Sequence, residues 1–186
     1  MRLTGGTDRG RKLRAPRGAS TRPTASRVRE AIFNILGPAP DTAVLDLFAG
    51  TGALGIEALS RGAPEAVFVE RDGRARAALA RNLRELGLEA RAVTVGTNVL
   101  QALSRLALAG QRFGWVFVDP PYATDDADRT LSALAGSELL TGSGIVIVEH
   151  DKRRVPPESA GDLHLVDRRV YGDTAVSFYR QAGRLA

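Results

Sequence analysis

From residue 42 onward, short apolar runs alternate with segments that have helical periodicity. The apolar runs are nearly continuous, which is typical of parallel strands that helices cover on both faces. Each intervening segment is long enough to connect two parallel strands by a crossover helix. The expected strands are 43–47, 66–69, 91–95, 115–118 and 145–148, and the expected helices are 52–61, 72–86 and one through Leu100, Leu103 and Leu106. This alternation predicts an open α/β sandwich.

The C-terminal part of the chain breaks the alternation. Strands are expected at 163–169 and 175–179, and the short segment between them, around Gly172, leaves no room for a helix. The two strands therefore form a hairpin, and one of them must run antiparallel to the other strands. We expect a mostly parallel, seven-stranded sheet with an antiparallel C-terminal hairpin.

Positive charge is concentrated at the N-terminus. Residues 1–30 contain nine basic and two acidic side chains, whereas the rest of the chain contains 17 basic and 19 acidic ones. Nearly all of the basic residues are arginine, whose guanidinium group matches the oxygens of a phosphate. This distribution favours a contact with nucleic acid, although a solvated basic tail would have the same composition.

Two units are expected along the chain. Residues 1–22 have glycines between short β-compatible pieces, which predicts a small basic hairpin arm outside the main core. Residues 23–186 form the main domain, which begins with a helix at 24–36. Arg27 and Arg29 fall on the polar face of that helix, where they extend the basic surface of the arm.

Several classes of protein are disfavoured by composition. The chain has no cysteine and only two histidines, which argues against disulfides, thiolate zinc sites and histidine metal clusters. It has neither an apolar run of membrane-spanning length nor the apolar core of a signal peptide. We therefore expect a cytoplasmic protein that uses no metal. His150 is expected in a solvated loop, and Phe113, Trp115 and Phe117 in the packing of a strand.

The first expected strand leads from Asp46 into a glycine-rich turn. Gly50, Gly52 and Gly55 have the G-x-G-x-x-G spacing that lets a backbone approach a ligand at the start of a helix. Glu70 ends the next strand, where its carboxylate can accept hydrogen bonds from ribose hydroxyls. These features predict a nucleoside-containing cofactor. Asp46 would repel a pyrophosphate, which argues against a nicotinamide dinucleotide and favours a cofactor with an amino group.

The fourth expected strand stops at Asp119-Pro120-Pro121-Tyr122. Two prolines stiffen the turn, so the Asp119 carboxylate and the Pro120 carbonyl are held as a pair of acceptors. Tyr122 adds an aromatic face on which a base can stack. This combination predicts binding of a planar heterocycle with an exocyclic amine, in the same cleft as Asp46 and Gly50.

With both motifs in view, the chain resembles the class I S-adenosylmethionine-dependent methyltransferases and, more narrowly, the RsmD family, which methylates a guanine N2 of the small-subunit 16S rRNA. The likeness covers nearly the whole chain. It is carried by Gly5-Gly6, by 9–13, by 22–24 with 27–30, by 46–55 and by 119–122. The first three stretches are more specific to the family than the last two, which occur in many amino-methyltransferases.

The resemblance implies a Rossmann-like fold, S-adenosylmethionine as cofactor, S-adenosylhomocysteine as product, and rRNA or an assembling 30S particle as partner of a monomeric enzyme. It assigns cofactor binding to Asp46, Phe48, Ala49, Gly50, Thr51, Gly52, Glu70 and Asn98. Catalysis falls to Asp119, Pro120 and Tyr122, and RNA contact to Arg9, Arg11, Lys12, Arg22, Arg27 and Arg29. Asn98 is a departure, because many relatives have aspartate there, and this leaves its adenine contact open.

Three other functions fit part of the pattern. A DNA methyltransferase acting on adenine N6 or cytosine N4 would share both motifs, but such enzymes usually need a target-recognition insert for which this chain has no room. A catalytically silent RNA-binding assembly factor would not need the intact acid, glycine turn and Asp-Pro-Pro-Tyr. A nicotinamide-dependent enzyme would show no affinity for S-adenosylhomocysteine.

Overall fold

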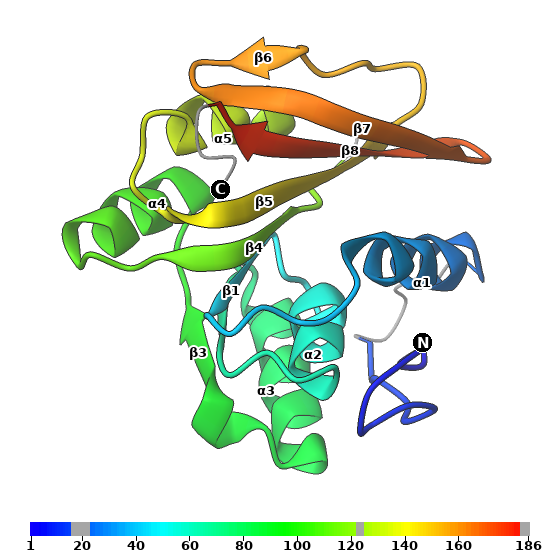
Figure 1. Cartoon of the computed structure of the whole chain (residues 1–186). Coiled ribbons are helices and arrows are strands. Elements are labelled where there is room, and N and C mark those ends of the chain that lie inside the picture. Colours follow the sequence, from blue (N-terminus) through cyan, green and yellow to red (C-terminus); the bar gives the residue numbers. More distant parts are fainter. Residues whose placement is uncertain (16–22, 122–124, 183–186) are drawn as a thin grey trace.

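A computed structural model describes residues 1–15, 23–121 and 125–182 (Figure 1). Its strands form one sheet in the order β3-β2-β1-β4-β5-β8-β7-β6. Strands β1 to β5 pair in parallel, and β8, β7 and β6 continue the sheet with antiparallel pairings. The strands are β1 (Val44–Leu47), β2 (Ala66–Val69), β3 (Ala92–Val95), β4 (Phe113–Val118), β5 (Leu140–Asp151), β6 (Ser159–Ala160), β7 (Leu163–Tyr171) and β8 (Thr174–Gln181).

Helices cover both faces of the sheet, as expected for parallel strands that are buried on both sides. The helices are α1 (Pro23–Leu36), α2 (Ala53–Ser60), α3 (Gly73–Leu86), α4 (Val99–Leu108) and α5 (Asp126–Leu134), with a short 3-10 helix, η1, at Glu89–Arg91. Residues of α1, α2 and α3 belong to the hydrophobic core on one face, and residues of α4 and α5 to the core on the other. Phe33 of α1 packs with its ring centroid 5.7 Å from those of Trp115 and Phe117, which confirms the packing role of these two aromatic residues.

The α/β architecture with an antiparallel C-terminal hairpin is confirmed, with corrections in detail. The sheet has eight strands among the described residues, because the two-residue β6 pairs with β7. Strand β5 begins at Leu140 rather than at 145, since its polar, glycine-containing start resembles a turn in sequence but pairs with Phe113. Helix α5 was not expected at all. His150 is 5% exposed in β5, where its Nε2 lies 2.9 Å from Ser177 Oγ, so the expected solvated loop position is wrong.

The N-terminal arm packs against the main domain. An isolated antiparallel bridge joins Arg2 and Lys12, and Leu3 and Leu13 are each 2% exposed within the hydrophobic core. The backbone N–H of Thr7 donates to Ser60 O at 2.8 Å, which attaches the arm to the end of α2. The expectation that the arm lies outside the main core is therefore wrong, because Leu3 and Leu13 contribute to that core.

No helix within the described ranges has the length and apolar character needed to cross a membrane.

Candidate active site

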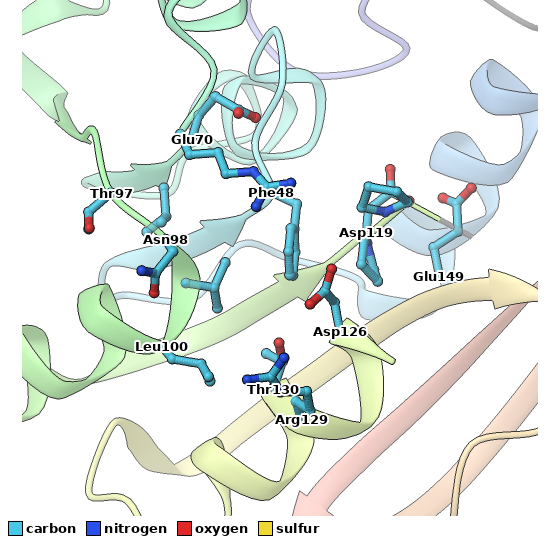
Figure 2. Close-up of a pocket in the computed structure, with 15 residues that line it drawn as sticks. Phe48, Glu70, Thr97, Asn98, Leu100, Asp119, Asp126, Arg129, Thr130 and Glu149 are labelled. Carbon is cyan, nitrogen blue, oxygen red and sulfur yellow. The ribbon is translucent and has the colours of Figure 1, made fainter. Parts of the chain in front are cut away.

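A cavity of about 690 Å³ opens at the carboxyl ends of the central parallel strands (Figure 2). Ligands of open α/β sheets bind at this edge, beside the point where the strand order reverses between β1 and β4. Of the residues predicted from the sequence, Phe48, Glu70, Asn98, Asp119 and Pro120 line the cavity. The other lining residues are Val69, Arg71, Thr97, Val99, Leu100, Pro121, Asp126, Arg129, Thr130 and Glu149.

The glycine turn between β1 and α2 has a backbone that demands glycine. Gly50 has φ 56° and Gly52 has φ 85°, and a Cβ on Gly52 would lie 2.4 Å from Leu79 Cδ1. Gly55 allows α2 to approach the sheet, since a Cβ there would lie 2.3 Å from Phe68 Cε1. Phe48 is the one non-glycine residue with positive φ in the described part of the chain, at 63°. Such strain is typical of functional loops.

Two predicted cofactor-binding acids hold this turn in place. The Asp46 carboxylate is buried and accepts the N–H of Gly55 at 2.8 Å. The Glu70 carboxylate accepts the N–H groups of Gly50 and Asp72, both at 2.8 Å. Asp46 and the turn residues Ala49, Gly50, Thr51 and Gly52 are not among the residues that line the cavity.

The Asp-Pro-Pro segment brings its first acceptor to the cavity at the end of β4. Burial raises the pKa of Asp119 well above its usual range, and the nearby charges of Glu149 and Asp46 raise it further. Pro120 and Pro121 line the wall next to it. Tyr122 lies outside the described residues, so its stacking role stays a prediction.

Burial also raises the pKa of Asp46 to about 7, and the negative charge of Glu70 adds to this effect. The site therefore concentrates carboxyl groups that favour a positively charged ligand. Asn98 also lines the cavity, and its side-chain oxygen accepts the Gln101 N–H at the start of α4, so its amide N–H groups are the donors that it can offer to a ligand.

Asp46→Asn is expected to increase the free energy of unfolding relative to the parent protein, and the gain should grow by about 3 kcal/mol between pH 5 and pH 8. The native pKa of about 7 exceeds that of an unfolded aspartate, so Asp46 contributes stability at low pH that is lost as pH rises through 7. Asparagine keeps the acceptor for Gly55 without ionising. Urea unfolding at a series of pH values measures the difference, and a gain independent of pH would contradict it.

Several lining residues were missed by the sequence analysis. Glu149 precedes His150 near the end of β5, and its position at the carboxyl end of a central strand was a usable signal. Asp126, Arg129 and Thr130 come from α5, a helix that is not among those expected from the sequence. Figure 2 shows these α5 side chains on the side of the cavity opposite Glu70.

The residues predicted to contact RNA separate into two groups. Arg9, Lys12 and Arg27 are exposed, and Arg11 is exposed while donating to Glu85 O at 2.7 Å. Arg22 lies outside the described residues.

Arg29 does not belong to the exposed surface that was predicted to contact RNA. Its side chain is 3% exposed, its Nε lies 3.2 Å from a Glu57 carboxylate oxygen, and its guanidinium also donates to Arg2 O. Glu57 in turn accepts the N–H of Thr4 at 2.9 Å and pairs with Arg61 at 3.0 Å. Helical periodicity placed Arg29 on the polar face, but the arm covers that face, so Arg29 holds the arm instead of meeting RNA.

Solved structures place this fold in a known class. A hypothetical protein of Thermus thermophilus superposes with a TM-score of 0.81 and 36% identity over 96% of this chain and 98% of its own. The S-adenosylmethionine-dependent methyltransferase of Agrobacterium tumefaciens, 17% identical over 88% of this chain and 64% of its own, has the same fold with a TM-score of 0.66. The strand order and the site at the β1–β4 switch point define a Rossmann-like class I methyltransferase fold.

Relatives in sequence define the family within that class. A profile of the family described as Conserved hypothetical protein 95 matches residues 1–180. The Escherichia coli protein named Ribosomal RNA small subunit methyltransferase D is 37% identical over 182 residues, which are 97% of this chain and 90% of that protein. The Bacillus subtilis protein YlbH is 40% identical over 98% of this chain and its own full length. The chain therefore belongs to this family, the RsmD family of methyltransferases.

Proposed function

We propose that this protein transfers a methyl group from S-adenosylmethionine to the exocyclic N2 of a guanine in small-subunit 16S rRNA. The observation that carries the proposal is the cavity that joins Glu70 and Asn98 at one end to Asp119 at the other, with Pro120 also in its lining. Such a cavity has room for a nucleoside next to a pair of acceptors for an amine. The names of the RsmD relatives supply the class of substrate, and a bacterial rRNA substrate implies action in the cytoplasm.

The residues at the first end of the cavity fit S-adenosylmethionine. Glu70 uses two of its roughly four acceptor positions, one on Gly50 of the glycine turn and one on Asp72, which leaves others for ribose hydroxyls. Phe48 and Asn98 would contact the adenine side, and the turn supported by Asp46 would hold the methionine part. The concentration of carboxyl groups suits the ammonium and sulfonium charges of this cofactor. When bound, the cofactor supplies a methyl group on a cationic sulfur.

The guanine N2 lone pair is delocalised into the ring, so the amine is a weak nucleophile. Acceptance of its two hydrogens by the Asp119 carboxylate and the Pro120 carbonyl would favour a pyramidal nitrogen whose lone pair points at the methyl carbon. As N2 takes up the methyl group that the cofactor would supply, the positive charge that develops on N2 would be stabilised by the Asp119 carboxylate and the Pro120 carbonyl. The proton then released from N2 passes to Asp119 or to water. Tyr122 would stack on the base, which must leave its RNA stack to enter the cavity.

Arg27→Met is expected to weaken RNA binding and to reduce the slope of log affinity against log salt by about 1, because one phosphate contact is lost. The exposed Arg9, Arg11 and Lys12 of the arm would form the rest of this RNA surface, together with Arg22. Fluorescence anisotropy with a 16S rRNA fragment over a salt series measures the slope. Glu30→Gln, an exposed neighbour, serves as the control. An unchanged slope for Arg27→Met would remove Arg27 from the surface.

The proposed function is tested by methyl transfer from labelled S-adenosylmethionine to three acceptors: 30S particles that lack the modification, naked 16S rRNA and duplex DNA. We expect label in particles or rRNA and none in DNA. Label only in DNA would support the DNA amino-methyltransferase instead. Binding of S-adenosylhomocysteine without transfer to any acceptor would support the silent assembly factor.

A further inference from the structure

We propose that Asp126 and Arg129 of α5 select guanine by its Watson–Crick edge, with the Asp126 carboxylate accepting N1–H and the Arg129 guanidinium donating to O6. This inference rests on the proposed function, because it assigns protein partners to the base of that substrate. It adds two specificity-determining residues to the acceptors Asp119 and Pro120.

Both side chains lie in the cavity beside the acceptors for the amine. Figure 2 shows the Asp126 carboxylate between Phe48 and Asp119, with Arg129 and Thr130 one helical turn further along α5. A spacing of three or four residues places side chains on one face of a helix, so Asp126, Arg129 and Thr130 face the cavity together. Helix α5 follows the Asp-Pro-Pro segment closely in the chain, so both elements flank the same space.

The other acids at the start of α5 have a different role. Asp125 and Asp128 both form ion pairs with Arg154 from the segment after β5, the second at 3.6 Å. Within the described ranges, neither the Asp126 carboxylate nor the Arg129 guanidinium has a hydrogen bond or an ion pair. Arg154 thus pairs with the acids that face away from the cavity, whereas Asp126 and Arg129 line it.

The order of donors and acceptors on a base explains why this pair selects guanine. In guanine the ring atom next to the reactive amine is a donor, N1–H, and the atom beyond it is the acceptor O6. In adenine and cytosine the ring nitrogen next to the exocyclic amine is an acceptor, which the Asp126 carboxylate would repel. In adenine, the position that corresponds to O6 of guanine carries a C–H group, so the Arg129 guanidinium would have no acceptor there. The order of acceptors and donor in the cavity therefore matches guanine and excludes the other amino bases.

The test compares guanine with 2-aminopurine, which keeps the N2 amine but has an acceptor at N1 and no O6. The substrates are 30S particles rebuilt with 16S rRNA that carries either base at the position methylated by the parent protein. Sites built to hydrogen-bond a substrate reject an analogue that lacks the group by large factors. We expect Asp126→Asn and Arg129→Gln each to lower kcat/KM for guanine by about 10²-fold, with a change for 2-aminopurine below about threefold.

Two controls make the result specific. Asp128→Asn changes an acid of the same helix that faces Arg154, and it should keep the parent preference for guanine. Binding of S-adenosylhomocysteine, measured by calorimetry, should be the same in the parent protein and in all three variants. An equal loss on both bases, or a loss of S-adenosylhomocysteine binding in the Arg129 variant, would overturn the recognition role. Failure of the parent protein to methylate guanine N2 would instead overturn the proposed function.

Discussion

Asp119→Ala is expected to lower kcat for methyl transfer by about 10³-fold while the affinity for S-adenosylhomocysteine changes little. The alanine removes the partly exposed carboxylate that would accept a hydrogen bond from the amine and take up its proton, at the end of the cavity opposite Glu70 and Asn98. Single-turnover transfer to 30S particles measures the rate, and calorimetry measures the affinity.

Asp119→Asn separates the two roles of this residue. Asparagine keeps a carbonyl acceptor for one amine hydrogen but cannot take up a proton, so its rate should fall between those of the parent protein and Asp119→Ala. Parent-like turnover in the alanine variant would contradict the assignment of Asp119 as the amine acceptor.

Arg29→Met is expected to lower the free energy of unfolding by about 3 kcal/mol, because it leaves the buried Glu57 carboxylate with one of its two arginine partners. The change also removes the donor to Arg2 O, which weakens the attachment of the arm. Urea unfolding followed by circular dichroism measures the loss.

Arg27→Met is the matched control, since Arg27 is exposed two residues earlier in the same helix. Its effect on unfolding should stay within about 0.5 kcal/mol. The two variants therefore have different expected effects. Arg29→Met lowers the free energy of unfolding, whereas Arg27→Met changes the salt dependence of RNA binding. Similar stabilities for both would contradict the structural role of Arg29.

The parallel part of the fold could be predicted because each of its strands is a short apolar run with a helix signal on either side. The β2 strand, Ala66–Val69, has the predicted bounds, and α3 ends at Leu86 as predicted, before Gly87 with φ 69°. The start of β5 could not be predicted, since Gly142 and Gly144 resemble turn residues and only pairing with β4 makes the segment extended. The same holds for β6, which has two residues and depends on β7.

The position of the candidate site could be predicted from the sequence, but several residues that line it could not. Glycine spacing and the Asp-Pro-Pro segment identified the elements around the cavity, because local backbone geometry requires those residues. Asp46 and Glu70 also support the turn through hydrogen bonds that spacing does not specify. Arg29 shows what helical periodicity cannot predict. Periodicity places Arg29 on the polar face of its helix, but it does not show that the N-terminal arm covers this face and buries the side chain.

The central claim is tested most directly by the identity of the nucleoside that carries the methyl group. Label from S-adenosylmethionine is transferred to 30S particles that lack the modification, the rRNA is digested to nucleosides, and these are separated by chromatography against standards of each methylated nucleoside. We predict label in N2-methylguanosine, which would establish the reaction, the substrate class and the target atom together. Label in N6-methyladenosine or N4-methylcytidine, with none in N2-methylguanosine, would contradict the account.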